Sequence, residues 1–191
     1  MKEDKTMQIE NRSELPLLLN RLNLVGAGAE IGVQIGLYSE EILEKSHLKL
    51  LYSIDCWKNF DKKHYVDIAN KSQLKQYYYY FKTILRLMKF RKRSKIIRKT
   101  SQEAARRFKE ECLDFVYIDA RHSYEGCKED ITYWWPKLKK GGVFAGHDYL
   151  NGMRKEGEFG VKKAVDEFIK NKKSKLFVTN EDWPTWYLIK R

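Results

Sequence analysis

The 191-residue sequence contains no long apolar run, and this absence argues against a membrane-spanning segment. No stretch approaches the roughly 18 consecutive apolar residues that a transmembrane helix needs. The opening residues, MKEDKTMQIENRSE, also lack the apolar segment of a signal peptide. We therefore expect a cytoplasmic protein with no membrane partner. The length predicts a single domain over residues 1–191, because it is too short for a cofactor domain plus a complete substrate domain.

Cysteines are few, and their spacing matches no common metal or redox motif. Cys56, Cys112 and Cys127 form no C-x-x-C pair. We expect them to be reduced residues of the core or of loops.

Acidic residues are scarce in one segment of the chain. Between Lys82 and Arg107 there are eleven lysines and arginines and the single acid Glu103, so this segment supplies +10 of the net charge of +12. Such a cluster is either a solvated surface or a binding site for phosphate, an acidic glycan or nucleic acid.

The stretch AEIGVQIGLYS, from Ala29 to Ser39, predicts a ligand site. Its first half, Ala29 to Ile35, has the β-branched and apolar content of a strand, and Gly36 breaks the run just before a helical pattern. In an open α/β sheet, small ligands bind at such turns because backbone amides there lack partners. Gly32 and Gly36 allow close approach of the backbone, and Glu30 is an acid that could anchor an amine.

The same region allows an alternative interpretation as a nicotinamide-dinucleotide site. Gly26, Gly28 and Gly32 give G-x-G-x-x-x-G, close to the dinucleotide fingerprint, if Leu22 to Val25 form the strand. That strand would have only four residues, and the following EIGVQI suits a strand better than a helix start. We therefore favour the first interpretation.

Hydrophobic periodicity predicts alternating helices and strands, hence an α/β fold. The expected helices are Ser13–Asn23 within an N-terminal region 1–24, Glu40–His47, Gln73–Phe90 within a tyrosine-rich basic region 72–94, Tyr124–Leu138 and Val161–Asn171, with a short helix and loop over Phe60–Ser72. The expected strands are Ala29–Ile35, Leu50–Cys56, Lys95–Thr100, Leu113–Ala120, GGVFAGHDY (residues 141–149), Lys175–Thr179 and Thr185–Lys190. The last two are joined by so short a loop that they should form an antiparallel hairpin.

Three further segments have two possible roles each. The tyrosines from Tyr77 to Tyr80 could stack on a substrate, although an aromatic stripe at helical spacing is more often core. Ser101 is a natural helix N-cap, or it borders a ligand. Residues 149–160 form a polar, glycine-bearing segment that is either a lid over the site or a connection.

Polar residues gather where the predicted strands end. Asp55 ends the second strand, where a carboxylate can accept both hydroxyls of a ribose, and Trp57 could lie against a purine. Candidate catalytic groups end the fourth and fifth strands: Asp119, His122, His147 and Asp148. Two acids and two imidazoles at adjacent strand ends are hard to explain as packing.

These motifs resemble a known family. E-I-G-V-x-x-G-x-x-S, followed by a strand that ends on Asp55, is similar to motif I and the acidic loop of class I S-adenosylmethionine-dependent methyltransferases. The resemblance is greatest to the small bacterial branch with the macrolide-sugar O-methyltransferases, and catechol O-methyltransferase is more distant. It extends from about Leu15 onward and is specific for cofactor and fold, but not for substrate. It implies a single Rossmann-like sheet of seven strands, the last antiparallel, with helices on both faces.

The resemblance also implies roles for individual residues. Ser101 and Gln102 match a Ser-Gln pair that borders the adenine in catechol O-methyltransferase. The implied cofactor residues are Glu30, Gly32, Gly36 and Ser39 for the methionine end, Asp55 and Trp57 for ribose and base, Ser101 and Gln102 for adenine, and Asp119 near the sulfonium. The implied reaction is O-methylation of a small hydroxylated metabolite or sugar.

His122 is the first candidate for the general base. Imidazole titrates near neutral pH, and His122 matches the catalytic lysine of catechol O-methyltransferase when counted from the shared strand-end Asp119. His147 is the second candidate.

A divalent metal is a further possibility that the resemblance raises. The metal-dependent relatives have ligands at the positions of Asp119, His147 and Asp148. Here a histidine replaces one oxygen ligand, which weakens the case for magnesium, whereas zinc or manganese tolerates the mixture better.

Two other functions stay open at this point. The basic segment 82–107 could direct a methyltransferase to RNA, which predicts steeply salt-dependent RNA binding. A catalytically silent binding scaffold is disfavoured because the acids and histidines are all present. A homodimer through the tyrosine-rich helix, Tyr77 to Phe81, is also possible.

Overall fold

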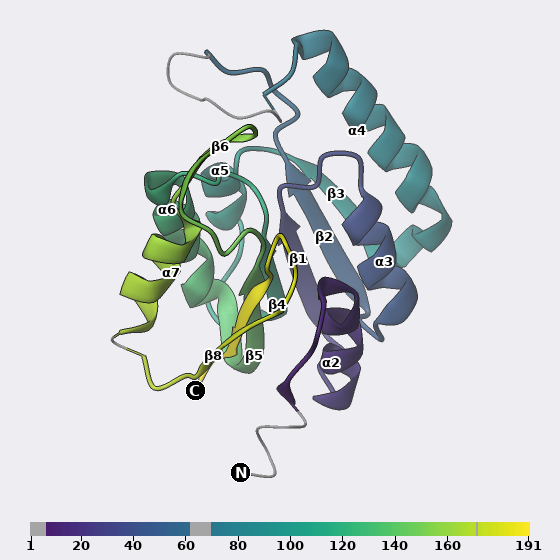
Figure 1. Ribbon diagram of the computed structural model, residues 1–191. Helices are drawn as coiled ribbons and strands as arrows, with labels where there is room; N and C mark the ends of the chain where they lie inside the picture. The colour runs from purple at the N-terminus through teal and green to yellow at the C-terminus, as the bar shows by residue number, and fades with distance from the viewer. Residues whose placement is uncertain (1–6, 62–69, 171) are drawn as a thin grey trace.

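A mixed sheet forms the centre of the protein, with the strand order β3-β2-β1-β4-β5-β9-β8 (Figure 1). The computed structural model describes residues 7–61, 70–170 and 172–191. The strands of the sheet are β1 (Ala27–Ile31), β2 (Leu50–Asp55), β3 (Ser94–Arg98), β4 (Leu113–Ile118), β5 (Leu138–Gly146), β8 (Leu176–Val178) and β9 (Trp186–Ile189). Strands β1 to β5 are mutually parallel, whereas β9 is antiparallel to both β5 and β8. The predicted terminal hairpin and the antiparallel last strand are therefore confirmed.

Helices cover both faces of this sheet. The α-helices are α2 (Leu15–Arg21), α3 (Leu37–Lys45), α4 (Gln73–Leu87), α5 (Ser101–Ala105), α6 (Tyr124–Trp134) and α7 (Val161–Ile169), and the short 3-10 helices are η1 (Arg12–Glu14), η2 (Met88–Arg93) and η3 (Trp135–Lys137). None of the described helices has the length and hydropathy that crossing a membrane requires.

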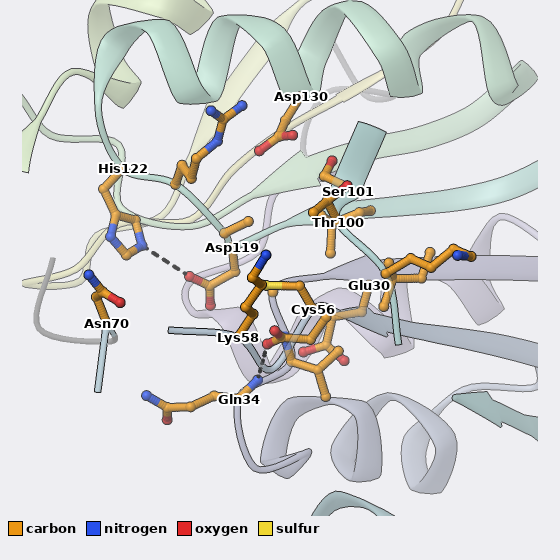
Figure 2. Close-up of a pocket in the computed structure, with 18 of the residues that line it drawn as sticks. Glu30, Gln34, Cys56, Lys58, Asn70, Thr100, Ser101, Asp119, His122 and Asp130 are labelled. Carbon is orange, nitrogen blue, oxygen red and sulfur yellow. Dashed lines mark hydrogen bonds and ion pairs between the residues drawn. The ribbon is translucent and has the colours of Figure 1, made fainter. Parts of the chain in front are cut away.

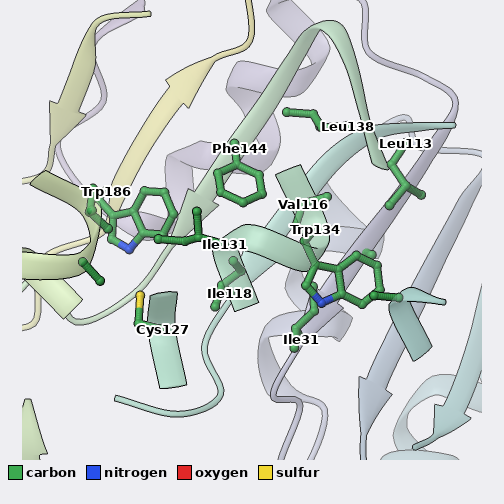
Figure 3. Packing of buried hydrophobic residues seen from close by; sticks show 14 of the residues in the cluster. Ile31, Leu113, Val116, Ile118, Cys127, Ile131, Trp134, Leu138, Phe144 and Trp186 are labelled. Atoms are coloured by element: carbon green, nitrogen blue, oxygen red, sulfur yellow. The ribbon is translucent and has the colours of Figure 1, made fainter. Parts of the chain in front are cut away.

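The all-buried strand β4 separates two hydrophobic clusters. Because side chains alternate across a strand, Phe115 and Tyr117 join the cluster that includes α2 and α3. Val116 and Ile118 join the other cluster, with residues of α5, α6 and α7, part of which Figure 3 shows around Trp134. This division confirms the predicted arrangement of helices on two faces.

The direction of chain winding reverses between β1 and β4. The chain runs outward from β1 to β2 and β3, and then returns to place β4 on the other side of β1. In open α/β sheets, the crevice outside the carboxyl ends of the strands at such a point is where ligands bind.

The first strand differs from its predicted range. It starts at Ala27 and ends at Ile31, because Gly32 has a φ of 88° and already turns the chain. The glycine that ends the strand is therefore Gly32, while Gly36 precedes α3. The nicotinamide interpretation is wrong in its local structure, since Gly28 lies inside β1.

Other predicted features are corrected or left untested. Thr100, not Ser101, caps α5, and it forms a capping box with Glu103. Residues 149–160 contain a small antiparallel hairpin, β6 (Gly152–Arg154) and β7 (Gly157–Phe159), rather than irregular structure. The three cysteines are free, as expected. The prediction for Phe60–Ser72 lies largely outside the described residues.

Candidate active site

A cavity of about 720 Å³ lies at the carboxyl ends of β1, β2 and β4. Of the predicted site residues, the structure brings seven to its lining: Glu30, Gly32, Asp55, Ser101, Gln102, Asp119 and His122. In the view of Figure 2, Asp119 lies between His122 on one side and Ser101 with Asp130 on the other. Gly36, Ser39, Trp57, His147 and Asp148 are outside the lining of this cavity.

Glu30 presents a buried carboxyl group to the cavity from strand β1. Its side chain is held by Ser39, whose hydroxyl donates to Oε2 and also lies 2.8 Å from the hydroxyl of Ser53. Burial raises the pKa of Glu30 to about 8, although the hydrogen bond from Ser39 lowers it. A ligand ammonium group would favour the charged form of this carboxyl group. Ser39 therefore acts through Glu30 rather than by lining the cavity.

Gly32 allows the turn after β1 to pass close to the end of β4. A Cβ atom at this position would lie 1.8 Å from the carbonyl oxygen of Asp119, and the φ of 88° is one that other residues rarely adopt. Gly36 instead allows α4 to pack closely against the turn before α3, since a Cβ there would lie 3.2 Å from Cγ2 of Thr83.

Asp55, the last residue of β2, fixes the turn between β1 and α3. Its Oδ2 accepts hydrogen bonds from the backbone amides of Val33 at 3.1 Å and Gln34 at 2.9 Å. Burial raises the pKa of Asp55, while these backbone amides lower it. The carboxylate thus shapes the wall of the cavity as well as lining it.

Trp57 does not reach the cavity, contrary to the predicted contact with a purine. Its side chain is fully buried, its Nε1 donates to the carbonyl oxygen of Gln34 at 2.7 Å, and its ring lies 4.8 Å from that of Tyr80. The neighbouring Cys56 and Lys58 line the cavity instead.

Ser101 and Gln102 line the cavity together with Asp130 of α6. The hydroxyl of Ser101 accepts a hydrogen bond from Nε1 of Trp134 at 2.9 Å and is also bonded to the carboxyl group of Asp130, while Gln102 donates to the hydroxyl of Tyr133. Burial raises the pKa of Asp130 to about 6, although Ser101 lowers it. Among the described residues, Oδ2 of Asp130 has no hydrogen-bond partner.

Asp148 lies between the two histidines. His122 Nε2 is 3.0 Å from Oδ2 of Asp148, and His147 Nδ1 is 2.8 Å from Oδ1. Burial by itself would raise the pKa of Asp148, but the hydrogen bonds from the two imidazoles outweigh it and hold this pKa well below its usual range. Asp119 is further away, with its Oδ1 3.5 Å from His122 Nε2. The ring of His122 also stacks on Phe159 of the β6–β7 hairpin at 5.1 Å.

A possible metal site in this cluster differs from the predicted one. The residues whose ligand atoms all lie within 4.8 Å of one another are Asp119, His122 and Asp148. His122 thus takes the place that the sequence assigned to His147. Two carboxylates with one imidazole suit zinc or manganese better than magnesium.

Arg12 and Asp130 are two charged residues among the lining residues that were not identified from the sequence. Arg12 has its Nη1 atom 3.6 Å from Oδ2 of Asp119, and its guanidinium carbon is 4.6 Å from the centre of the Tyr38 ring. Neither residue belongs to a local motif, and each reaches the cavity only through tertiary packing. Asp130 carries one detectable signal, since an acid on the buried side of an amphipathic helix is unusual.

Comparison with solved structures supports the same fold. A proposed caffeoyl-CoA O-methyltransferase from Staphylococcus aureus superposes with a TM-score of 0.66 at 17% identity, covering 98% of this chain and 88% of the other. A proposed rRNA methylase from Clostridium thermocellum superposes with a TM-score of 0.64 at 14% identity, covering 96% of this chain and all of the other. At such low identity, these similarities establish the fold alone.

Sequence comparison identifies the family. An uncharacterized protein, y4gI, from Sinorhizobium fredii is 37% identical over 68 residues, which is 36% of this chain and only 7% of that protein. The family described as a methyltransferase domain matches residues 29–149, more than half of the chain and the part that contains every strand end at the cavity. The chain therefore belongs to the methyltransferase-domain family, for which S-adenosylmethionine is the implied cofactor.

Proposed function

We propose that the protein transfers the methyl group of S-adenosylmethionine to a hydroxyl group of a small metabolite or sugar. The observation that carries the proposal is the shared cavity: a buried carboxyl group, Glu30, and a carboxylate-bound imidazole, His122, line the same space. The first suits the amino-acid end of the cofactor, and the second suits removal of a proton from the acceptor.

The residues around Glu30 fit the methionine end of the cofactor. The ammonium group would pair with Glu30, and the guanidinium group of Arg12, which also lines the cavity, would pair with the carboxylate. Burial by itself would lower the pKa of Arg12, but the nearby Tyr117 and Asp119 raise it by more than burial lowers it. The guanidinium group therefore stays charged. The main chain at Gly32 supplies the close approach that such a ligand needs.

The other end of the cavity fits adenine. The unpartnered Oδ2 of Asp130 can accept a hydrogen bond from the exocyclic amino group, which would satisfy a buried polar atom. Ser101 orients this carboxyl group through its own hydrogen bond to Asp130, while Nε1 of Trp134 donates to the same Ser101 hydroxyl. Asp55 also lines the cavity and is the candidate for the ribose hydroxyls.

Methyl transfer requires that the acceptor oxygen be aligned with the methyl group and that the acceptor hydroxyl lose its proton. S-adenosylmethionine supplies an already activated methyl group on its sulfonium. The imidazole of His122 would take up the proton of the acceptor hydroxyl, and the carboxylate of Asp148 lies 3.0 Å from its Nε2. Asp148 then stabilises the imidazolium that forms, since its own pKa is far below neutral.

The experiment that tests this function is methyl transfer from labelled S-adenosylmethionine to a panel of catechols, hydroxylated sugars and flavonoids. We expect label in an oxygen-bound methyl group, with less than a twofold change after treatment with EDTA, because His122 removes the proton. A loss of more than tenfold that manganese or zinc restores would instead assign Asp119, His122 and Asp148 to a metal site.

RNA is the alternative acceptor, and the basic segment 82–107 is the observation that favours it. However, Arg86 and Lys89 of this segment pair with Glu40 of α3, and Arg93 donates to backbone carbonyl groups, so part of its charge serves internal contacts. Binding of RNA that falls steeply with salt would support the alternative.

A further inference from the structure

Helix α4 buries polar side chains and exposes apolar ones, the reverse of an ordinary surface helix. Its buried residues are Gln76, Thr83 and Leu87, whereas most of its large apolar side chains face outward. Leu74 is 80% exposed, Met88 is 66% exposed and Phe81 is 56% exposed. The outward apolar row, which we call the α4 face, consists of Leu74, Tyr77, Tyr78, Phe81, Ile84 and Leu85 of α4, together with Met88, the first residue of η2. Figure 1 shows α4 on the outer side of the molecule, beside α3.

Polar contacts hold the helix in this orientation. The hydroxyl of Thr83 donates to the carbonyl oxygen of Gln34, and Nε of Arg86 donates to that of Ile35, so the inner side of α4 bonds to the turn after β1. Arg86 and Lys89 also form ion pairs of 2.6 and 2.7 Å with Glu40. These hydrogen bonds and ion pairs fix the inner side of α4 against the protein, and the apolar row on its other side is therefore exposed.

The α4 face is also strongly basic. From Gln73 to Arg93 the sequence has seven lysines and arginines and no acid. Arg86 and Lys89 of these pair with Glu40, and Arg93 donates to backbone carbonyl groups, which leaves four others for the surface. Lys75 and Lys82 are exposed, one heptad apart, and both lie over the ring of Tyr78, at 4.9 and 5.5 Å. Arg91 and Lys92 continue the exposed charge beyond Met88.

We propose that the α4 face docks on an anionic lipid bilayer, with the helix parallel to the surface. A helix with an aromatic and aliphatic side flanked by lysines is the pattern of interfacial membrane binding, where apolar burial and attraction to anionic headgroups act together. Such binding needs no membrane-spanning segment. The inference is independent of the proposed methyl acceptor.

Charge and shape argue against the two other occupants. In a dimer that pairs α4 with the α4 of a second copy, Lys75 and Lys82 of each chain would face the cations of the other without any acid to compensate. Single-stranded RNA would stack on tyrosines, but Leu74, Leu85 and Met88 offer it no ring. An anionic bilayer uses both the cations and the aliphatic side chains.

Flotation with vesicles tests the proposal on the full chain. We expect the wild type to float with vesicles of equal parts phosphatidylglycerol and phosphatidylcholine, and not with phosphatidylcholine alone. The double variant Lys75→Gln, Lys82→Gln should lose about thirtyfold in partitioning, since each cation near an anionic surface contributes on the order of 1 kcal/mol. The double variant Phe81→Gln, Leu85→Gln should lose more than about tenfold through its lost apolar burial.

The matched control is Leu17→Gln, Met153→Gln, which removes two exposed apolar side chains elsewhere and should change partitioning less than twofold. Circular dichroism establishes that each variant is folded. Absence of flotation, or equal losses in the control, would overturn the proposal. So would a dimer in light scattering that depends on Phe81 and Leu85, or tighter binding of wild type to single-stranded RNA than to the anionic vesicles.

Discussion

Glu30→Gln is expected to weaken the binding of S-adenosylhomocysteine by about 2 to 4 kcal/mol, the range typical for loss of one partner of a buried charge pair. The substitution keeps the size of the side chain and its contact with Ser39, but it removes the negative charge that would face the ligand ammonium group. Isothermal titration calorimetry of the two proteins at neutral pH measures the difference. Unchanged affinity would place the ammonium group elsewhere.

The same substitution should have the opposite effect on stability. The pKa of Glu30 is raised from its ordinary value of 4.5 to about 8, so between these values the folded state binds more protons than the unfolded state. Stability of the wild type therefore falls as pH rises from about 4.5 to 8, and the loss persists above that range. Glu30→Gln escapes this loss and should be more stable than the wild type by a few kcal/mol at pH 9, a magnitude set by the size of the pKa shift.

Urea unfolding at pH 5 and at pH 9 measures the free energy of unfolding with Glu30 protonated and with Glu30 charged. The control is Glu158→Gln, an exposed glutamate on β7, whose stability curve should parallel that of the wild type. Parallel curves for Glu30→Gln as well would contradict the assigned burial and raised pKa.

His122→Gln is expected to lower kcat by about a hundredfold to ten-thousandfold, the usual contribution of a general base. Affinity for S-adenosylhomocysteine should change less than twofold, because His122 contacts Asp148 and Asp119 at the acceptor end of the cavity. His147→Gln is the matched control. His147 bonds to the same Asp148 but lies outside the cavity lining, so we expect a loss of less than about tenfold, the cost of one hydrogen bond.

Single-turnover measurements with saturating cofactor distinguish the two histidines. A larger loss of turnover in His147→Gln than in His122→Gln would make His147 the general base instead of His122. Normal turnover in His122→Gln would show that His122 is not the general base.

The parallel strands were predictable because each is a short apolar run that ends on a polar or glycine residue. The residues from Leu113 to Ile118 are all buried, and the sequence there is accordingly continuous in its hydrophobicity, apart from Asp114. The end of β1 was placed too late, because Val33 and Ile35 continue the apolar pattern while the backbone of Gly32 has already turned. Both Gly32 and Gly36 have a positive φ, 88° and 77°, and the local pattern does not tell which of them ends the strand.

Side-chain direction was the harder part to predict. Trp57 follows Asp55 at a position suited to contact a base, yet its positive φ of 42° and its bond to Gln34 turn it into the interior. The apolar periodicity of α4 identified the helix correctly but favoured the wrong face as the buried one, because the contacts of Thr83 and Arg86 are long-range. Arg12 and Asp130 reach the cavity from segments distant in sequence, and no spacing rule connects them to it.

Calorimetric titration of the wild type with S-adenosylhomocysteine, beside NADH, tests the central claim most directly. We expect one site that binds S-adenosylhomocysteine and no detectable binding of NADH. We also expect the measured enthalpy to depend on the buffer at pH 7, because Glu30 would release its proton when it pairs with the ammonium group. Absence of binding, or a preference for NADH, would contradict the assignment of the cavity to a methyl donor.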